Sequence, residues 1–394
     1  MISVKNAIDI IEQTSLKHDS KIISLDSALN KVLFQDVFSI INMPPFNQSA
    51  MDGYAIKHSL NKTYKLIGES AAGSTKDFQL KQGEAVRIFT GALVPKGANT
   101  VVMQEHIEIF NKNLTITKIP VKGANIRIAG EQIRQGELAL KKGTLLNEAA
   151  IGFLACLGIT KVSIFKSPKV SIVITGNELQ PPGEVLEKGK VYESNAIMLS
   201  TALRNIGIDA ITIFNTKDNY EATKATIKQA LNTSDVVLIS GGISVGDYDF
   251  VKQSLKDNQV EESFYKVNQK PGKPLWFGTK ANTYVFGLPG NPASVLTCFY
   301  VYVLPLIRRM SGFQQNHLER IEVKSQSSFK NPSKKTLFLK AVIKDDGATI
   351  LSGQSSAMLR SYSTSNGLLY VDENTTEIHV DDNVECIKLP NVWR

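Results

Sequence analysis

The sequence predicts a multidomain α/β protein in which a parallel-sheet domain is joined to β-rich modules. From 168 to 312, β-branched runs alternate with helical patterns, which is typical of a parallel sheet with right-handed crossovers. From 63 to 141, and again after Gly312, short alternating apolar runs predict β-rich modules. A chain of 394 residues has room for about two to four such domains.

Two helical patterns lie outside these regions. Apolar residues recur at helical spacing from Val4 to Ile11, and the early acidic residues are unlike a cleavable signal segment. A second pattern follows Asn147, which can cap a helix, and ends near Gly158, which can close it. We therefore expect a helical N-terminal segment and a short helix after the first β-rich region.

Composition restricts the class of protein. Hydrophobic residues make up 42% and charged residues 21%, as in ordinary globular proteins. The net charge of +8 favours anionic ligands, but the basic residues are spread along the chain, which disfavours nucleic acid. Three cysteines without a CxxC pair disfavour a disulfide framework or structural zinc and favour a cytoplasmic protein. The longest apolar run, Ala293 to Ile307, contains Pro305 and is shorter than the ~20 residues of a membrane span.

The predicted strand at 235–240, DVVLIS, leads into the glycine turn GGISVGD at the carboxyl edge of the sheet, where ligands gather. Gly241 and Gly242 let backbone amides approach an anion closely. Asp247 or Asp249 then begins the next helix, where a carboxylate can cap amides or accept Mg²⁺. Capping alone is the alternative for Asp247, whereas function is favoured for Asp249.

Two more acidic residues stand at strand ends. Glu178 follows the run KVSIVITGN, and Asp218 precedes the helix that begins near Asn219. Together with the acid at 247 or 249 they predict a divalent-metal site. The alternative is that each is a solvated loop acid or a helix cap.

Two segments favour an oxyanion ligand. NQKPGKPLWFG presents Lys270 and Lys273 on either side of a Pro–Gly turn, although an ordinary exposed turn is the alternative. GLPGNPAS at 287–294 ends a strand and begins a helix that Asn291 can cap, and the helix N-terminus can bind an anion. Simple capping is the alternative for this segment.

The N-terminal half contains two polar loops, PPFNQSAMDGYA with Asp52 and RIFTGALVP with Thr90. Neither residue has an obvious catalytic partner nearby in sequence, so spacing alone favours a structural role. No Ser-His-Asp order, HExxH motif or P-loop lysine stands out, which disfavours acyl transfer, zinc proteolysis and a P-loop ATPase.

Taken in order, PPFNQSAMDGYA, RIFTGALVPKGANTVVMQE, TGNE, SGGISVGDYDF, KPGKP and GLPGNPAS resemble the motifs of the molybdopterin molybdenumtransferase family, which includes MoeA and the gephyrin E domain. The resemblance covers nearly the whole chain. It implies an elongated homodimer of four parts: 1–38 with 144–167, an inserted β-rich domain at 39–143, an α/β molybdopterin-binding domain at 168–312 and a C-terminal β-barrel at 313–394. It also implies that adenylylated molybdopterin and molybdate, with Mg²⁺, yield molybdenum cofactor and AMP.

The resemblance assigns roles to individual residues. Gly241, Gly242 and Ser244 would cradle the phosphate, Asp218 and Asp249 would hold Mg²⁺, and Glu178 would assist there. The substrate-binding set also includes Lys270, Lys273, Pro289, Gly290, Asn291, Ser294, Lys340 and Ser356. Asp52 and Thr90 would enter the catalytic cleft from the second copy of the dimer.

Three positions depart from the family pattern: Gln132, Lys340 and Ala357 stand where an acid, an Arg and a His are common. A lysine cannot replace the bidentate Arg fork, so oxyanion affinity is expected to differ, and a diverged paralogue is an open alternative.

Two other functions are alternatives. An adenylyltransferase acting one step earlier would share the α/β part but would not need the β-rich modules, and a dimeric scaffold of gephyrin type would bind peptides. The expected protein partners are molybdopterin adenylyltransferase and apo-molybdoenzymes, with no nucleic acid and no membrane.

Overall fold

The computed structural model describes residues 1–243 and 250–390, and its internal contacts divide the chain into two compact units. The first unit consists of Met1–Lys21, Asn30–Val32 and Ile164–Arg394, and the second of Ile22–Leu29 and Leu33–Ser163. The α/β domain and the C-terminal β domain belong to the first unit. The β-rich region of the N-terminal half belongs to the second.

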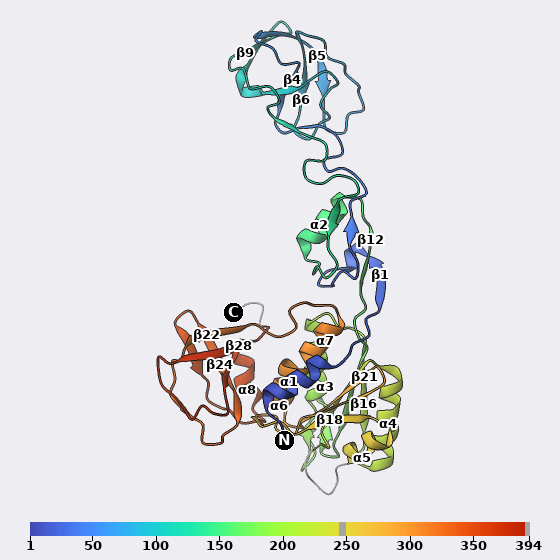
Figure 1. Ribbon diagram of the computed structural model, residues 1–394, viewed down its shortest axis with the longest axis vertical. Coiled ribbons are helices and arrows are strands. Elements are labelled where there is room, and N and C mark those ends of the chain that lie inside the picture. The colour runs from blue at the N-terminus through green and yellow to red at the C-terminus, as the bar shows by residue number, and fades with distance from the viewer. Residues whose placement is uncertain (244–249, 391–394) are drawn as a thin grey trace. The chain divides into compact units, whose positions relative to one another are not determined.

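The α/β domain is built on a six-stranded sheet with the order β16-β13-β17-β21-β20-β18 (Figure 1). The strands are β13 (Val170–Thr175), β16 (Ile211–Thr216), β17 (Val236–Ser240), β18 (Glu261–Tyr265), β20 (Trp276–Lys280) and β21 (Thr283–Leu288). β16, β13, β17 and β21 pair in parallel, which confirms the predicted α/β class. β20 and β18 extend the sheet as antiparallel strands.

Helices cover both faces of this sheet, as Figure 1 shows. Successive residues of a strand point to opposite faces, so Ile172 and Ile174 of β13 pack in one core and Val173 in the other. Helices α4 (Tyr220–Thr233) and α5 (Phe250–Asp257) complete the core that contains Val173. The opposite core is completed by residues of α1 (Val4–Gln13), α3 (Asn195–Asn205), α6 (Pro292–Cys298) and α7 (Leu304–Met310), together with Tyr362 of the C-terminal part.

Helix α6 continues through a π-helical segment, Phe299–Val303, into α7. The whole stretch Pro292–Met310 is long and apolar enough to cross a membrane, but 78% of it is buried inside the protein, as in a core helix. Pro305, which interrupts the apolar run in the sequence, lies in the first turn of α7, where the missing N–H of proline is tolerated.

The C-terminal part forms the expected β domain, with a sheet in the order β19-β24-β26-β28-β22 and β25 paired to β24. Its strands are β22 (Arg320–Lys324), β24 (Thr336–Lys344), β25 (Gly347–Ile350), β26 (Gly367–Val371) and β28 (Asn383–Lys388), and a short pair is formed by β23 (Phe329–Lys330) and β27 (Glu377–Ile378). Strand β19 (Gln269–Lys270) comes from the α/β part of the chain and pairs in parallel with β24. The two domains of the first unit are therefore joined by a shared sheet.

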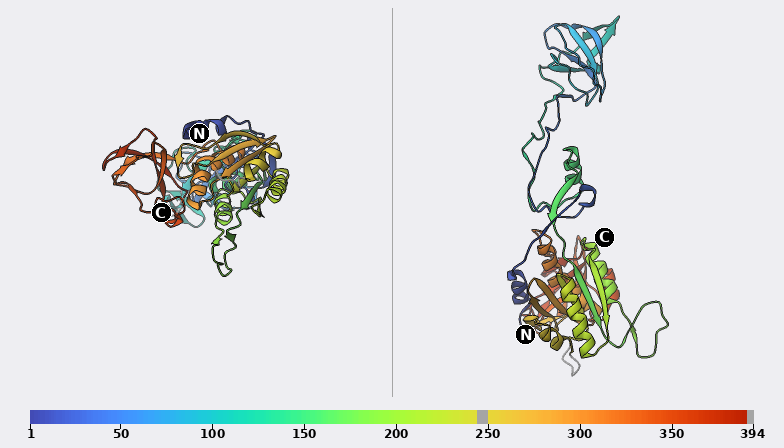
Figure 2. Two further views of the ribbon diagram at one scale, coloured as in Figure 1. Left: turned by 90° about the horizontal axis from the view of Figure 1, so that it is seen from below. Right: turned by 90° about the vertical axis from the view of Figure 1, so that its right-hand side faces the viewer.

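Between β13 and α3 the chain loops away from the sheet, as Figure 2 shows, and contains the short pair β14 (Leu179–Gln180) and β15 (Val191–Tyr192). Helix α8 (Leu359–Thr364) follows the 353–358 loop of the C-terminal domain.

The second unit contains a six-stranded sheet in the order β7-β4-β6-β5-β9-β8, as the sequence pattern predicts. The strands are β4 (Gly53–Ile56), β5 (Thr63–Ser70), β6 (Glu84–Ile88), β7 (Thr100–Met103), β8 (Ile107–Phe110) and β9 (Asn113–Ile116). Short pairs join β2 (Val37–Phe38) to β11 (Leu138–Leu140) and β3 (Gln48–Ser49) to β10 (Ile126–Arg127). Helix α2 (Glu148–Cys156) begins at Asn147, whose Oδ1 accepts a hydrogen bond from Ala150 N at 2.9 Å, so the predicted cap is confirmed.

Candidate functional site

The candidate site lies at the edge where the four parallel strands end. Ile174 of β13 pairs with Ser240 of β17, and Ser240 pairs with Leu288 of β21, so the turns that follow these strands emerge side by side. Strand β20 begins at Trp276 opposite Gly287 of β21, which brings the turn before β20 to the same edge. The glycine turn, Asp218, the lysine turn and the start of α6 are thus gathered at one edge of one sheet.

The glycine turn after β17 requires glycine. Gly241 has a φ of +96° and Gly242 a φ of +62°, a region that other residues rarely adopt. A Cβ atom at Gly241 would lie 2.3 Å from the backbone oxygen of Thr175. The turn therefore packs its backbone against the end of β13 without a side chain between them. Ser244, Asp247 and Asp249 lie outside the described residues.

Asp218 follows β16 and is fixed by two contacts. Its Oδ1 accepts a hydrogen bond from Thr175 Oγ1 at 2.9 Å, and its backbone N donates to Asn177 Oδ1 at 3.2 Å. Its second carboxylate oxygen takes no hydrogen bond from the described residues. Mg²⁺ is commonly bound through one or two carboxylates together with phosphate oxygens and water, so one directed oxygen fits such an ion.

Glu178 is exposed and folds back on the turn after β13, since a Cβ atom at Gly176 would lie 2.8 Å from Glu178 Oε2. Over residues 1–243 and 250–390, no group of three or more His, Cys, Asp and Glu side chains is arranged to hold a metal ion. The described part of the edge therefore offers single carboxylates rather than a complete set of protein ligands for a metal ion.

Lys270 and Lys273 are both exposed, and they flank the buried Pro271 and Gly272. Lys270 belongs to β19 and pairs with Leu337 of β24, so the C-terminal domain borders this turn. Two ammonium groups held on one short turn suit a small oxyanion.

The start of α6 differs from the sequence-based interpretation. Asn291 does not cap the helix; its Nδ2 donates to Ser356 Oγ at 2.8 Å. The carbonyl of Ser356 instead accepts from Ala293 N at 3.0 Å and Ser294 N at 3.3 Å. These two amides are thus occupied and are not open to an anion. Ser294 is 2% exposed, which argues against direct contact between its side chain and a ligand in this conformation.

The preceding turn contains the other two predicted substrate-binding residues. Pro289 is buried, whereas Gly290 and Asn291 are exposed. A ligand at the edge therefore meets the backbone of Gly290 and the side chain of Asn291 before it meets Pro289.

Lys340 is placed differently from the expectation that it binds substrate. Its side chain is buried in β24, at 2% exposure, and its Nζ donates to the carbonyls of Gly353 at 2.7 Å, Ser355 at 3.2 Å and Met358 at 3.1 Å. An ammonium group has three donors, and all three are used here. Lys340 therefore holds the 353–358 loop, which contains Ser356, and has no donor left for an oxyanion.

Asp52 and Thr90 form a pair in the second unit. Asp52 Oδ1 accepts from Thr90 N at 2.7 Å and from Thr90 Oγ1 at 2.8 Å. These backbone and side-chain hydrogen bonds, with a smaller contribution from Arg87, hold the pKa of Asp52 below its ordinary value. Both residues are exposed, so the pair presents an ionised carboxylate to solvent.

One residue of the edge is missed by sequence reasoning. Asn195, at the start of α3, donates through Nδ2 to Ser240 Oγ at 2.9 Å and to Gly290 O at 2.8 Å. Its Oδ1 is buried and has no hydrogen-bond partner among residues 1–243 and 250–390. Asn195 thus ties the end of β17 to the turn before α6. Its only sequence signal is an Asn at a helix start, which normally indicates a cap.

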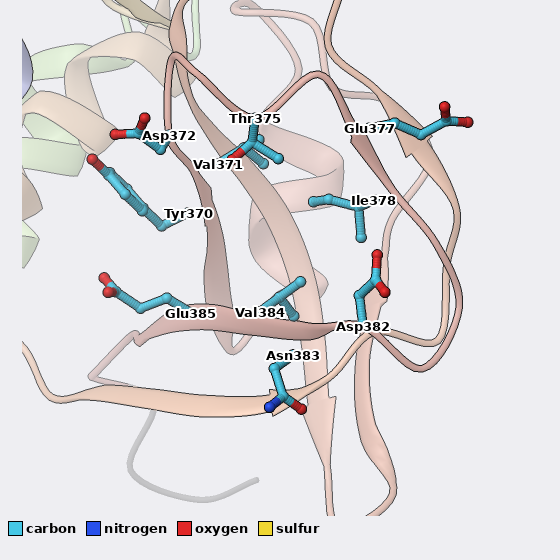
Figure 3. A pocket seen from close by; sticks show the side chains of 10 residues that line it. All are labelled: Tyr370, Val371, Asp372, Thr375, Glu377, Ile378, Asp382, Asn383, Val384 and Glu385. Atoms are coloured by element: carbon cyan, nitrogen blue, oxygen red, sulfur yellow. The ribbon is translucent and has the colours of Figure 1, made fainter.

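A cavity of about 350 Å³ lies in the C-terminal domain (Figure 3). Four carboxylates line it: Asp372, Glu377, Asp382 and Glu385. Glu385 is ion-paired with Arg320 and Glu377 with Lys330, and the two remaining carboxylates make this lining less suited to an oxyanion than the exposed lysines of the strand edge.

Comparison with known families divides the chain into three matched regions. The MoeA N-terminal region (domains I and II) matches residues 2–158, the model described as "Probable molybdopterin binding domain" matches 171–309, and the MoeA C-terminal region (domain IV) matches 322–389. Together with the fold, these matches define a protein with an α/β domain of the molybdopterin-binding type and additional β domains.

Known proteins resemble the chain over most of its length. The molybdopterin molybdenumtransferase of Haemophilus influenzae is 36% identical over 312 residues, covering 78% of this chain and 76% of the relative. The protein of the same name from Staphylococcus aureus is 32% identical over 360 residues, covering 89% of this chain and 86% of the relative. The chain therefore belongs to the molybdopterin molybdenumtransferase (MoeA) family, and the predicted enzyme class, a transferase, is confirmed.

The fold agrees with solved structures of this family. Two structures of a molybdopterin biosynthesis MoeA protein from Pyrococcus horikoshii superpose with TM-scores of 0.85 and 0.83 at 29% and 27% identity. They cover 98% and 99% of this chain and 99% and 100% of the solved chains.

Proposed function

We propose that this protein transfers molybdate to adenylylated molybdopterin and releases AMP. The observation that carries the proposal is the gathering of a glycine turn, a directed carboxylate and two exposed lysines at one edge of the α/β sheet. A substrate that contains a diphosphate and receives an oxyanion needs both halves of such a site. The match along the whole chain supports the transferase over a stand-alone adenylyltransferase.

The glycine turn and the carboxylates handle the diphosphate. The backbone of Gly241 and Gly242 approaches a phosphate closely because no side chain intervenes, and Ser244 is a further proposed phosphate contact. Asp218 offers its second carboxylate oxygen to Mg²⁺, with Asp249 as the second proposed ligand, and Glu178 assists beside them. Bound Mg²⁺ would neutralise charge on the diphosphate as AMP leaves.

The lysine turn handles the oxyanion. Lys270 and Lys273 neutralise molybdate, and Ser356, held beside the start of α6, contributes a polar contact. Ser294 helps to position Ser356 through the hydrogen bond from its backbone N–H to the Ser356 carbonyl, rather than through its side chain. Lys340 helps to position Ser356 by holding the 353–358 loop.

We further propose a cytoplasmic homodimer in which Asp52 and Thr90 serve the site of the second copy. Light scattering of the purified protein measures the dimer directly. Molybdopterin adenylyltransferase and apo-molybdoenzymes are the proposed protein partners.

The test is incubation of the purified protein with adenylylated molybdopterin, Mg²⁺ and molybdate. The wild-type protein is expected to release AMP, whereas Asp249→Ala and Asp218→Asn keep the fold and release little. Asp209→Asn, at an exposed position before β16, is the matched control and should behave as wild type. Consumption of ATP and free molybdopterin instead would identify an adenylyltransferase. Unchanged molybdoenzyme activity after gene deletion, with loss of a protein complex, would identify a scaffold.

A further inference from the structure

A buried polar network lies directly beneath the turn that carries Lys270 and Lys273. Gln269 is 1% exposed, and its Nε2 donates to Pro271 O and Gly272 O, each at 3.1 Å. Its Oε1 accepts a hydrogen bond from the hydroxyl of Tyr302. Nε2 also lies 3.6 Å from Cys298 Sγ, so the two amide hydrogens of Gln269 are shared among the two central carbonyls of the turn and this sulfur atom.

The orientation of this amide is determined by its partners. Pro271 O and Gly272 O can only accept, so they fix the NH₂ group of Gln269 on their side. The amide oxygen then faces Tyr302, whose hydroxyl must donate. Burial raises the pKa of Tyr302 well above its ordinary value, so this hydroxyl stays protonated.

The turn is packed tightly on the network. Gly272 has a φ of +88°, and a Cβ atom there would lie 2.6 Å from Cys298 Sγ and 2.8 Å from Gln269 Nε2. The Lys273 end of the turn is fixed separately, since Lys273 O accepts from Val267 N at 3.0 Å and Leu275 N at 2.9 Å. The Gln269 amide thus determines the path of the backbone between the two lysines.

Tyr302 reaches Gln269 from the π-helical segment Phe299–Val303, where the helix is locally widened. Its side chain is 1% exposed and lies in the main core of the α/β domain, far too buried to contact a ligand. Burying a hydroxyl or an amide costs free energy unless its donors and acceptors form hydrogen bonds. Here the Tyr302 hydroxyl and the Gln269 amide oxygen form a hydrogen bond with each other.

We propose that Tyr302 and Gln269 are positioning residues that set the spacing of the Lys270 and Lys273 ammonium groups for a tetrahedral oxyanion. The inference rests on the proposed function, because it concerns the oxyanion half of the same site. Held in place by the network, the turn is preorganised, so little ordering is needed when the oxyanion binds.

Tyr302→Phe is the sharpest test, because it removes one oxygen atom and leaves Gln269 Oε1 without its donor. Tyr300→Phe is the matched control: Tyr300 belongs to the same π-helical segment, and its hydroxyl makes no hydrogen bond to the described residues. Binding of tungstate and molybdate is measured by calorimetry on the full-length protein. We expect Tyr302→Phe to weaken binding about tenfold, as loss of one buried hydrogen-bond partner implies, and Tyr300→Phe to bind as wild type.

A second readout separates positioning from general damage. In the transfer reaction, Tyr302→Phe should raise the KM for molybdate about tenfold and leave kcat at saturating molybdate within about twofold. In a Lys270→Met, Lys273→Met background, adding Tyr302→Phe should cause no further loss of binding. If Tyr302→Phe does not fold, Gln269→Met is used in its place, and it should weaken oxyanion binding and raise the KM for molybdate in the same way.

Wild-type affinity in a folded Tyr302→Phe variant would overturn the inference and leave the proposed function intact. An equal loss of affinity in the lysine-deficient background would overturn it as well, since the effect would not act through the lysines. A wild-type protein that binds no oxyanion would contradict both this inference and the oxyanion half of the proposed function.

Discussion

Replacing Lys340 with methionine tests whether a buried charge holds the 353–358 loop and, through Ser356, the start of α6. Methionine keeps most of the side-chain length and removes all three donors. The carbonyls of Gly353, Ser355 and Met358 then lose the hydrogen bonds at 2.7, 3.2 and 3.1 Å.

The size of the effect follows from what each carbonyl retains. Three bonds from a charged donor at about 1.5–3 kcal/mol each would suggest a very large loss. However, the single hydroxyl hydrogen of Ser361 also bonds Gly353 O at 2.7 Å, with Met358 O at 3.3 Å as its weaker alternative, and Ser355 O accepts from Met358 N at 3.1 Å. Gly353 O and Ser355 O therefore each keep a donor, and methionine also avoids the cost of burying an ammonium group. We therefore expect a loss of about 1–3 kcal/mol in the free energy of unfolding.

The assay combines urea unfolding with amide hydrogen exchange. Because Ala293 N and Ser294 N donate to Ser356 O, their exchange should become faster in Lys340→Met. Lys344→Met, at an exposed position of the same strand, is the control and should change neither quantity. Adding Ser361→Ala to Lys340→Met should cost about 1 kcal/mol more than the two single changes predict, because Gly353 O then loses both of its side-chain donors. Unchanged stability and exchange in Lys340→Met, or strict additivity, would refute the reasoning.

Three further predictions concern the edge and the second unit. Gly241→Ala should lower the free energy of unfolding by about 2–4 kcal/mol, because it adds backbone strain at a φ of +96° and a Cβ atom 2.3 Å from Thr175 O. Gly189→Ala, at a φ of +84° with open space around it, is the control and should lose only the part due to strain. Equal losses in urea unfolding would disprove the clash. Asp218→Asn should keep the bond from Thr175 and lower AMP release about 100-fold, and release at the wild-type rate would remove Asp218 from the site. The pKa of Asp52 is depressed below 3.8, so its contribution to stability is present above 3.8 and is lost as the pH falls through the folded-state pKa. Thr90→Val removes the hydroxyl donor, so it should raise the pKa of Asp52 toward 3.8 and narrow the pH range between the folded-state pKa and 3.8, as measured by NMR titration. An unchanged pKa would show that the Thr90 hydroxyl does not stabilise the ionised carboxylate.

Local patterns in the sequence predict the features that depend on neighbouring residues. The strand at 235–240 and the glycines after it are predicted because a continuous apolar run and a glycine pair encode a buried strand and a positive-φ turn directly. The cap of α2 by Asn147 is predicted for the same reason, since donor and acceptor lie three residues apart.

Features that depend on distant residues are not predicted in this way. Asn291 is an ordinary cap candidate, but Ser356, 65 residues away, supplies the carbonyl and competes for its side chain. Lys340 resembles a ligand-binding cation until the fold shows three carbonyls around it. The roles of Asn195 and Gln269 likewise depend on partners from other elements, and a single sequence contains no pairing information for them.

The most direct test of the central claim is a coupled measurement of AMP release and reconstitution of an apo-molybdoenzyme by the purified protein. With adenylylated molybdopterin, Mg²⁺ and molybdate, we predict that AMP and active molybdoenzyme appear together, and that both are lost when Lys270 and Lys273 are replaced by methionine. Molybdoenzyme activation without AMP release, or AMP release that needs neither lysine nor molybdate, would contradict a single edge that handles both the diphosphate and the oxyanion.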